Sequence, residues 1–240
     1  MNFKTLLISQ VLFILIISGC AVYYPQVTPP NLINKKGDLN VQGGGTLYSP
    51  YMYPDGVYGS ASYGINSFIS SQVYSSYKIF SGANFEGNIS LYKNITPKIF
   101  VSGTVGYSYG FNKVEMWNMK YGDYTWKGNY NLQFGKIIFS KTSKLFEWGT
   151  QLKIGVLSPD YTKKYNGEND EIIVKNVNQN GISYEPGFFV KYNSSSRMEY
   201  YVQLSACYIE PINKPDYYTL PYWYFGNVGF GVSYKLNKSE

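Results

Sequence analysis

The chain has 240 residues but no histidine, a single arginine and only 15% charged residues. The absence of histidine excludes the Ser-His-Asp and Cys-His arrangements of hydrolases and the usual proton shuttle near neutral pH. Because Arg197 is the one arginine, planar bidentate recognition of phosphates or bases is almost unavailable despite a net charge of +6, and nucleic acid is not expected as a partner. The 27 Tyr and 24 Gly favour a folded, β-rich chain.

The N-terminal residues have the composition of a signal peptide. Lys4 gives a positive start, and residues 6–17 form an apolar run that is short for a membrane span. The run leads into residues 17–20 (ISGC), which resemble the lipobox of bacterial lipoproteins. This resemblance implies that residues 1–19 are removed and that Cys20 carries lipid. The alternatives are an ordinary secretory signal, whose A-x-A-like cleavage site is missing, and an anchor helix that happens to end in a cysteine.

Residues 20–37 are expected to form an extended tether, because they are rich in proline and polar residues. Residue 21 is Ala rather than Asp, and the lipoprotein sorting rule resembled here then implies the outer membrane, with the lipidated N-terminus on its periplasmic side. If Cys20 carries lipid, Cys207 has no partner for a disulfide within the chain. We expect Cys207 to be a small side chain that faces and fills the lumen.

From residue 38 onward, apolar residues alternate with polar or small ones, as in β-strands with two different faces. Val202, for example, lies on the apolar parity and Gln203 on the polar one. The alternation loses phase near Lys136 and is interrupted by Pro186, so bulges or strand ends are expected there. The pattern predicts an all-β barrel domain over residues 38–237. Its strands are expected near residues 39–48, 57–65, 68–79, 84–92, 99–111, 124–139, 146–156, 182–192, 198–208 and 228–236.

The predicted links between strands alternate between tight and mostly longer ones, with a short exception near Ser81. Short turns on one rim and long loops on the other are typical of bacterial transmembrane β-barrels, which have an even number of strands. If the chain starts at the periplasmic rim, where lipid on Cys20 would place it, ten strands put every tight turn in the periplasm. The longer loops are expected at residues 49–56, 112–123, 159–180 and 210–224.

The end of the chain carries a further motif. Residues 227–234 (NVGFGVSY) resemble the C-terminal insertion signal of outer-membrane barrel proteins, although the chain runs on to Glu240 without a terminal aromatic. The mature chain therefore resembles small bacterial outer-membrane β-barrel proteins. That resemblance implies an antiparallel up-and-down transmembrane barrel of about ten strands that contacts outer-membrane lipid and the barrel-assembly machinery. Residues 20–37 are also similar to a group of uncharacterised lipidated barrels, which implies no particular activity.

Two functional hypotheses follow from these features. The first is a non-enzymatic outer-membrane lipoprotein with a structural, surface-interaction or narrow-permeation role. The second is a lipid-anchored periplasmic soluble barrel, similar to lipocalins, that binds a small ligand, because any half-buried sheet also alternates. The apolar parity points toward lipid in the first case and toward an internal cavity in the second. Neither hypothesis calls for a cofactor.

The polar parity of a membrane barrel lines a narrow lumen, in which charges must pair or contact water. We expect a structural Glu/Lys network there, with a polar conduit or ligand cavity as the alternative and no catalytic residue. The residues assigned to this lumen network are Glu86, Glu147, Lys153, Glu185, Lys191, Glu199 and Lys235.

Residues 215–225 are unusually aromatic and are the candidate surface-contact loop. Their side chains suit stacking on sugars or on a protein partner, but a girdle at the membrane interface explains them as well. The acidic residues 168–171 lack the spacing and glycine of a loop-type calcium site, and no metal site is expected. The candidate contact residues are Tyr217, Tyr218, Tyr222, Trp223 and Tyr224.

Overall fold

The computed structural model describes residues 33, 35–48, 53–78, 82–118, 122–166, 172–177, 180–195, 197–212 and 223–236. No helix in these residues is long and apolar enough to cross a membrane. The strands are β1 (Leu39–Tyr48), β2 (Tyr53–Gly64), β3 (Ile69–Lys78), β4 (Gly82–Thr96), β5 (Ile99–Asn118), β6 (Gly122–Thr142), β7 (Phe146–Asn166), β8 (Ile172–Val177), β9 (Gly181–Asn193), β10 (Met198–Pro211) and β11 (Trp223–Lys235).

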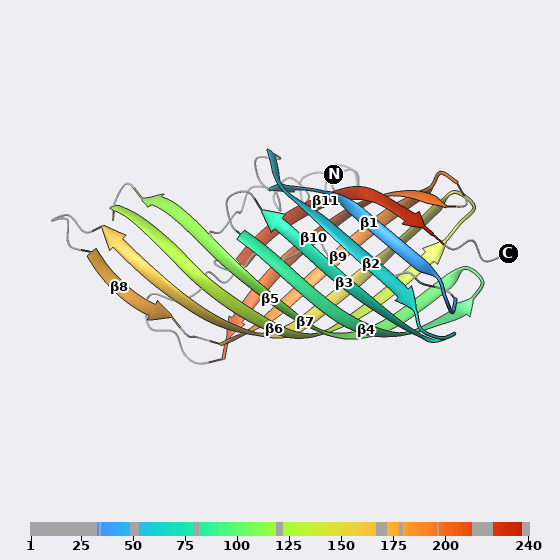
Figure 1. Ribbon diagram of the computed structural model, residues 1–240, viewed down its shortest axis with the longest axis horizontal. Coiled ribbons are helices and arrows are strands. Elements are labelled where there is room, and N and C mark those ends of the chain that lie inside the picture. The colour runs from blue at the N-terminus through green and yellow to red at the C-terminus, as the bar shows by residue number, and fades with distance from the viewer. Residues whose placement is uncertain are drawn as a thin grey trace, which may run out of the picture.

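Ten of these strands form a closed antiparallel barrel (Figure 1). Sequential strands pair from β1 to β7, β7 pairs with β9, and the order continues through β10 to β11. The barrel closes because β1 also pairs with β11, from Asn40 opposite Lys235 to Tyr48 opposite Asn227. β8 is outside this ring and pairs with the end of β7. The predicted fold class and the prediction of ten barrel strands are confirmed.

The tight turns after β2, β4, β6 and β9 lie on one rim, which we call the short-turn rim. Local side-chain hydrogen bonds explain why these links are short. The side chain of Asn66 accepts the N–H groups of Phe68 and Ile69, and the Ser143 hydroxyl accepts the N–H of Phe146. β1 begins and β11 ends at the same rim, so both ends of the barrel domain lie there.

Three strands are much longer than the alternation predicts. β5, β6 and β7 have 20, 21 and 21 residues, and they run on beyond the other strands at the rim opposite the short turns (Figure 1). The loops predicted at residues 112–123 and 159–180 are therefore wrong in large part, because residues 112–118, 122–123 and 159–166 are strand and β8 follows. The strands stay paired throughout these segments.

The alternation itself predicts correctly which way the side chains point. Val202 is 49% exposed on the outer face, whereas its neighbour Gln203 is completely buried in the lumen. The irregularity expected near Lys136 is wrong, because β6 keeps its register with both neighbours there. Around Pro186, β9 keeps its register with β7, but its ladder with β10 has no pairs between Gly187 opposite Ser205 and Tyr184 opposite Tyr208. Irregular registers occur instead between residues 46 and 47, 94 and 96, and 205 and 207.

Inward-facing glycines make room for large rings in the lumen. A Cβ on Gly110 would lie 2.3 Å from the ring of Tyr130, and one on Gly106 would lie 2.4 Å from the ring of Phe134. Both aromatic residues are on β6 and are buried, and each ring covers a glycine of the adjacent β5. Tyr58, Tyr74 and Tyr201 form a second buried group on β2, β3 and β10. Aromatic side chains therefore fill much of the barrel interior.

Candidate functional site

The structure places the seven predicted lumen residues on inward positions of the barrel. Glu86, Lys153, Glu185, Lys191 and Glu199 are buried, whereas Glu147 and Lys235 are half-buried near the short-turn rim. They do not form one network. Three of them meet halfway along the barrel, and the other four lie at the short-turn rim.

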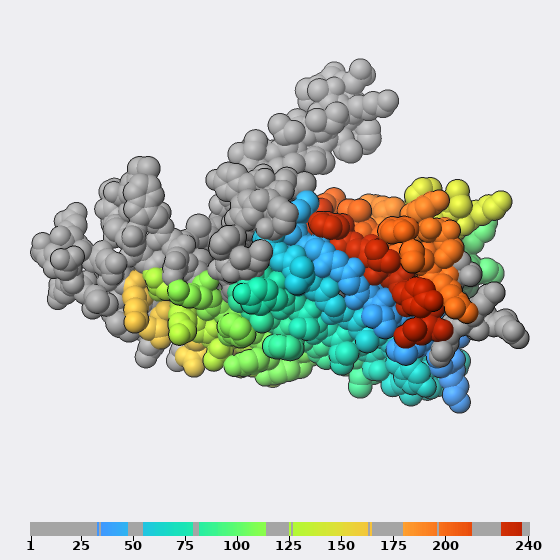
Figure 2. All heavy atoms as spheres, turned by 45° about the horizontal axis from the view of Figure 1, so that its top comes forward, coloured from blue at the N-terminus to red at the C-terminus, as the bar shows by residue number. Residues whose placement is uncertain are grey.

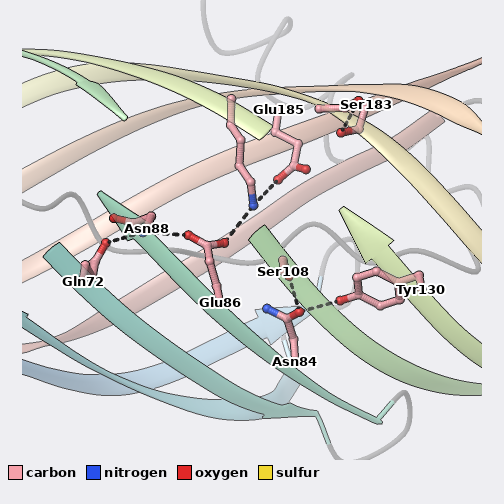
Figure 3. A network of polar contacts seen from close by, with 10 residues as sticks. Gln72, Asn84, Glu86, Asn88, Ser108, Tyr130, Ser183 and Glu185 are labelled. Atoms are coloured by element: carbon pink, nitrogen blue, oxygen red, sulfur yellow. Dashed lines mark hydrogen bonds and ion pairs between the residues drawn. The ribbon is translucent and has the colours of Figure 1, made fainter. Parts of the chain in front are cut away.

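The mid-lumen cluster consists of Glu86 on β4, Lys153 on β7 and Glu185 on β9. The Lys153 ammonium lies 3.0 Å from Glu86 Oε2 and 3.9 Å from Glu185 Oε2, so one cation holds two carboxylates (Figure 3). The same ammonium lies 4.3 Å from the centroid of the Phe134 ring. All three charged side chains are almost completely buried, and the ion pairs are therefore shielded from bulk water.

Amide side chains extend the mid-lumen cluster toward β3. Asn88 Nδ2 donates to Glu86 Oε1 at 3.1 Å and to Gln72 Oε1 at 3.2 Å (Figure 3). A separate group lies nearer the rim opposite the short turns, where Asn84 Oδ1 accepts hydrogen bonds from Ser108 and Tyr130. Such hydrogen bonds offset the cost of burying polar groups.

The rim cluster consists of Lys191 on β9, Glu199 on β10 and Lys235 on β11. Glu199 Oε1 accepts a hydrogen bond from Lys235 at 2.5 Å, and Glu199 Oε2 lies 3.5 Å from Lys191 Nζ. Glu147 lies at the same rim but accepts a hydrogen bond from Ser140 at 2.7 Å. Here a single carboxylate serves two cations, and 40% of the Lys235 side chain is exposed.

Three inward charges are not among the predicted residues. Asp55 and Lys78 form a buried ion pair of 3.2 Å, and Asp55 also accepts a hydrogen bond from Thr46. Asp55 was assigned to the loop at residues 49–56, although β2 already starts at Tyr53. Lys78 shares the parity of the inward residues on β3 and was therefore recognisable from the sequence.

Lys136 is the third of these charges. It is 1% exposed, and its Nζ has no hydrogen-bond partner within the described part of the chain. Lys136 faces Lys153 directly in the pairing of β6 with β7. The two lysines therefore share a level of the lumen, but Lys153 contacts the carboxylates and Lys136 does not.

The lipidation site and most of the predicted surface-contact residues lie outside the part of the chain that the structure describes. Cys20, Tyr217, Tyr218 and Tyr222 lie outside the described residues, as do residues 168–171. The backbone of Trp223 and Tyr224 pairs with β10 at the start of β11. Cys207 is a free, buried thiol in the lumen. Among the described residues, no group of three or more Cys, Asp and Glu side chains could hold a metal ion.

Comparison with solved structures finds the same fold in a bacterial outer-membrane barrel. The chain is similar to the outer membrane protease OmpT of Escherichia coli, with a TM-score of 0.55, 12% sequence identity and coverage of 83% of this chain and 94% of OmpT. It is also similar to Ail, the attachment invasion locus protein of Yersinia pestis, with a TM-score of 0.37, 11% identity and coverage of 84% and 99%. No protein-family model and no curated protein sequence matches the chain. The likeness to OmpT shows a shared fold.

Proposed function

We propose that this protein is a non-enzymatic lipoprotein of the bacterial outer membrane, in which the barrel is embedded and its long strands present a contact surface outside the cell. The observation that carries this proposal is the apolar outer face of the barrel. Among the described residues, each of the ten barrel strands exposes at least one large hydrophobic side chain on the outer face. A soluble protein rarely exposes a continuous apolar surface of this kind, whereas a membrane barrel requires one.

Aromatic residues border this apolar face at both rims. Near the short-turn rim, each exposed aromatic residue lies within three residues of the end of its strand. These residues are Tyr63, Trp148, Tyr192, Tyr200 and Tyr234. Tyr77, Phe85, Tyr107, Tyr109 and Phe111 are exposed toward the opposite rim. Two aromatic belts with aliphatic side chains between them fit the two interfaces of a bilayer.

The contact role rests on the long strands. β5, β6 and β7, with β8 paired to the end of β7, extend past the ends of the remaining strands on the rim opposite the short turns (Figure 1 and Figure 2). With the N-terminus on the periplasmic side, this extension lies outside the cell, where its backbone and the neighbouring loops can contact a partner. A role in narrow permeation is less well supported, because aromatic rings and ion pairs fill much of the lumen.

Fractionation of the chain with and without Cys20→Ala tests the membrane location. The Cys20→Ala protein is expected to stay in the membrane fraction and to change its gel mobility on heating, because the barrel itself is embedded. If Cys20→Ala becomes soluble, lipid is the sole anchor, and the lipid-anchored soluble barrel that binds a small ligand takes the place of this proposal.

The orientation of the outer face is tested by adding a charge to it. Val202→Lys is expected to cost about 2–4 kcal/mol of folding free energy in lipid, because it places an ammonium in the hydrocarbon layer. Ile212→Lys is the matched control, since Ile212 is equally exposed but follows the end of β10. Equal effects of the two substitutions would contradict the membrane location of the outer face.

A further inference from the structure

Ile33 and residues 35–38, which precede β1, lie at the short-turn rim. Ile33 is 2% exposed and belongs to one buried cluster with four other side chains. The four belong to β4, β5, β6 and β9, and their chain neighbours on either side face outward or are more exposed. Ile33 therefore lies in the mouth of the lumen and not on the outer wall. The other members of the cluster are Tyr92, Phe100, Ile138 and Phe189.

Backbone contacts with the end of β2 hold this segment in place. The chain reverses at Gly37, whose φ of 79° favours glycine. Gly37 N–H donates to Gly64 O at 2.8 Å, and Gly64 N–H donates to Asp38 O at 2.9 Å. A Cβ on Gly64 would lie 2.1 Å from Lys35 O and 2.9 Å from Ile33 Cγ2. The segment is thus fixed at β2 while Ile33 reaches side chains of strands across the mouth.

Polar groups without protein partners lie farther into the lumen. Four buried polar side chains have no hydrogen-bond partner among the described residues. They are the hydroxyl groups of Ser62 on β2 and Ser102 on β5 and the amides of Gln42 and Gln203. Ser62 is two residues from Gly64, so this polar layer begins directly behind Ile33. Buried polar groups of this kind are normally satisfied by water.

We propose that Ile33 together with Lys35, Lys36, Gly37 and Asp38 forms an N-terminal plug that closes the periplasmic mouth of the barrel over this polar layer. Displacement of the plug opens this polar layer to water and to small solutes from that side. The assignment of the mouth to the periplasm rests on the proposed function. The closure of the mouth does not depend on the proposed function, because it follows from the contacts of Ile33 and Gly64.

The test measures how fast a thiol behind the plug reacts. Cys20 and Cys207 are first replaced by serine, and Ser62→Cys is introduced as the reporter. Labelling with a small, charged methanethiosulfonate reagent is expected to be about tenfold faster when Ile33→Asp is added, because a buried carboxylate favours the open mouth. Gly64→Ala is expected to act in the same direction, since its Cβ displaces Lys35.

The matched control is Ile65→Asp, which changes an exposed isoleucine at the same rim. It is expected to leave the labelling rate within about twofold of the parent, because Ile65 does not line the mouth. If Ile33→Asp and Gly64→Ala proteins that keep the heat-dependent gel shift label no faster than this control, the plug proposal is wrong.

A reporter in the plug itself covers the case in which Ile33→Asp does not fold. Ile33→Cys preserves a small apolar side chain and is expected to react at least about tenfold more slowly than Ile65→Cys, because opening must precede reaction. Equal rates would overturn the proposal. Loss of the heat shift or of membrane retention in the Cys20→Ala protein would instead overturn the proposed function, and the labelling comparison can be made with the barrel in a membrane or in solution.

Discussion

The mid-lumen cluster and the rim cluster contain the same residue types in opposite proportions. In the middle of the barrel, Glu86 and Glu185 share Lys153, whereas at the short-turn rim Lys191 and Lys235 share Glu199. Every member of the first cluster is buried, but the second opens to solvent through Lys235. Each cluster has two ion pairs, so the number of ion pairs does not by itself determine how much a cluster contributes to the free energy of unfolding.

Access of water to the charges determines how much each ion pair contributes to stability. Removal of one partner from a buried ion pair leaves a charge that neither water nor protein compensates, which typically costs about 3–5 kcal/mol. An ion pair at the surface typically contributes about 0–1 kcal/mol, because water replaces the lost partner. We therefore expect lysine-to-methionine substitutions in the two clusters to differ severalfold in their effect on stability.

The largest effect is expected for Lys153→Met. This substitution removes the cation that contacts both Glu86 and Glu185, and it should lower the free energy of unfolding by about 3–5 kcal/mol. Urea unfolding of the barrel in lipid vesicles, followed by tryptophan fluorescence, measures this change. A loss below about 1 kcal/mol would show that the middle of the lumen is as well solvated as a protein surface.

Lys191→Met should have an intermediate effect. Lys191 is buried, but its partner Glu199 keeps its hydrogen bond to Lys235 after the substitution. We expect a loss of about 1.5–3 kcal/mol, the range for a hydrogen bond or contact to a charged group. The same urea titration compares it with Lys153→Met. If Lys191→Met is the more damaging of the two, the sharing of one carboxylate by two cations does not protect the rim cluster.

Lys136→Met separates burial from pairing. Lys136 faces Lys153 across β6 and β7 and is equally buried, yet it makes no hydrogen bond within the described residues. Removal of its charge also removes its desolvation cost, so we expect a change of about 1 kcal/mol or less in unfolding free energy. A loss equal to that of Lys153→Met would mean that long-range attraction to the carboxylates, and not contact, sets the stability of this layer.

The outward and inward parities could be predicted from the sequence because the outer face of the barrel carries mostly apolar side chains and the lumen mostly polar ones, as at Val202 and Gln203. The orientation of Lys136 was missed for a physical reason. On β6, the apolar residues Leu132 and Phe134 also face inward, where they fill the lumen beside glycines, so that polarity no longer distinguishes the two faces.

The length of the long strands was missed for a related reason. Beyond the ends of the remaining strands, β5, β6 and β7 no longer belong to a closed wall with an inner and an outer face, so the two faces need not differ in polarity. The backbone pairing of β5 with β6 continues through this extension as far as Asn118 opposite Gly122. The separation of the lumen charges into two clusters depends on how neighbouring strands are aligned with each other. This alignment cannot be derived from a single sequence.

The smallest effect is expected for Lys235→Met. The Lys235 side chain is 40% exposed, and Glu199 retains Lys191 on its other oxygen, so water and one cation remain for the carboxylate. The loss should be about 0.5 kcal/mol and should shrink further at high salt, because the pair is open to counterions. Urea titrations of the parent and of Lys235→Met at low and high ionic strength measure both quantities. A loss that is several times larger and insensitive to salt would mean that the rim is as dry as the middle of the lumen, and the contrast between the two clusters would then disappear.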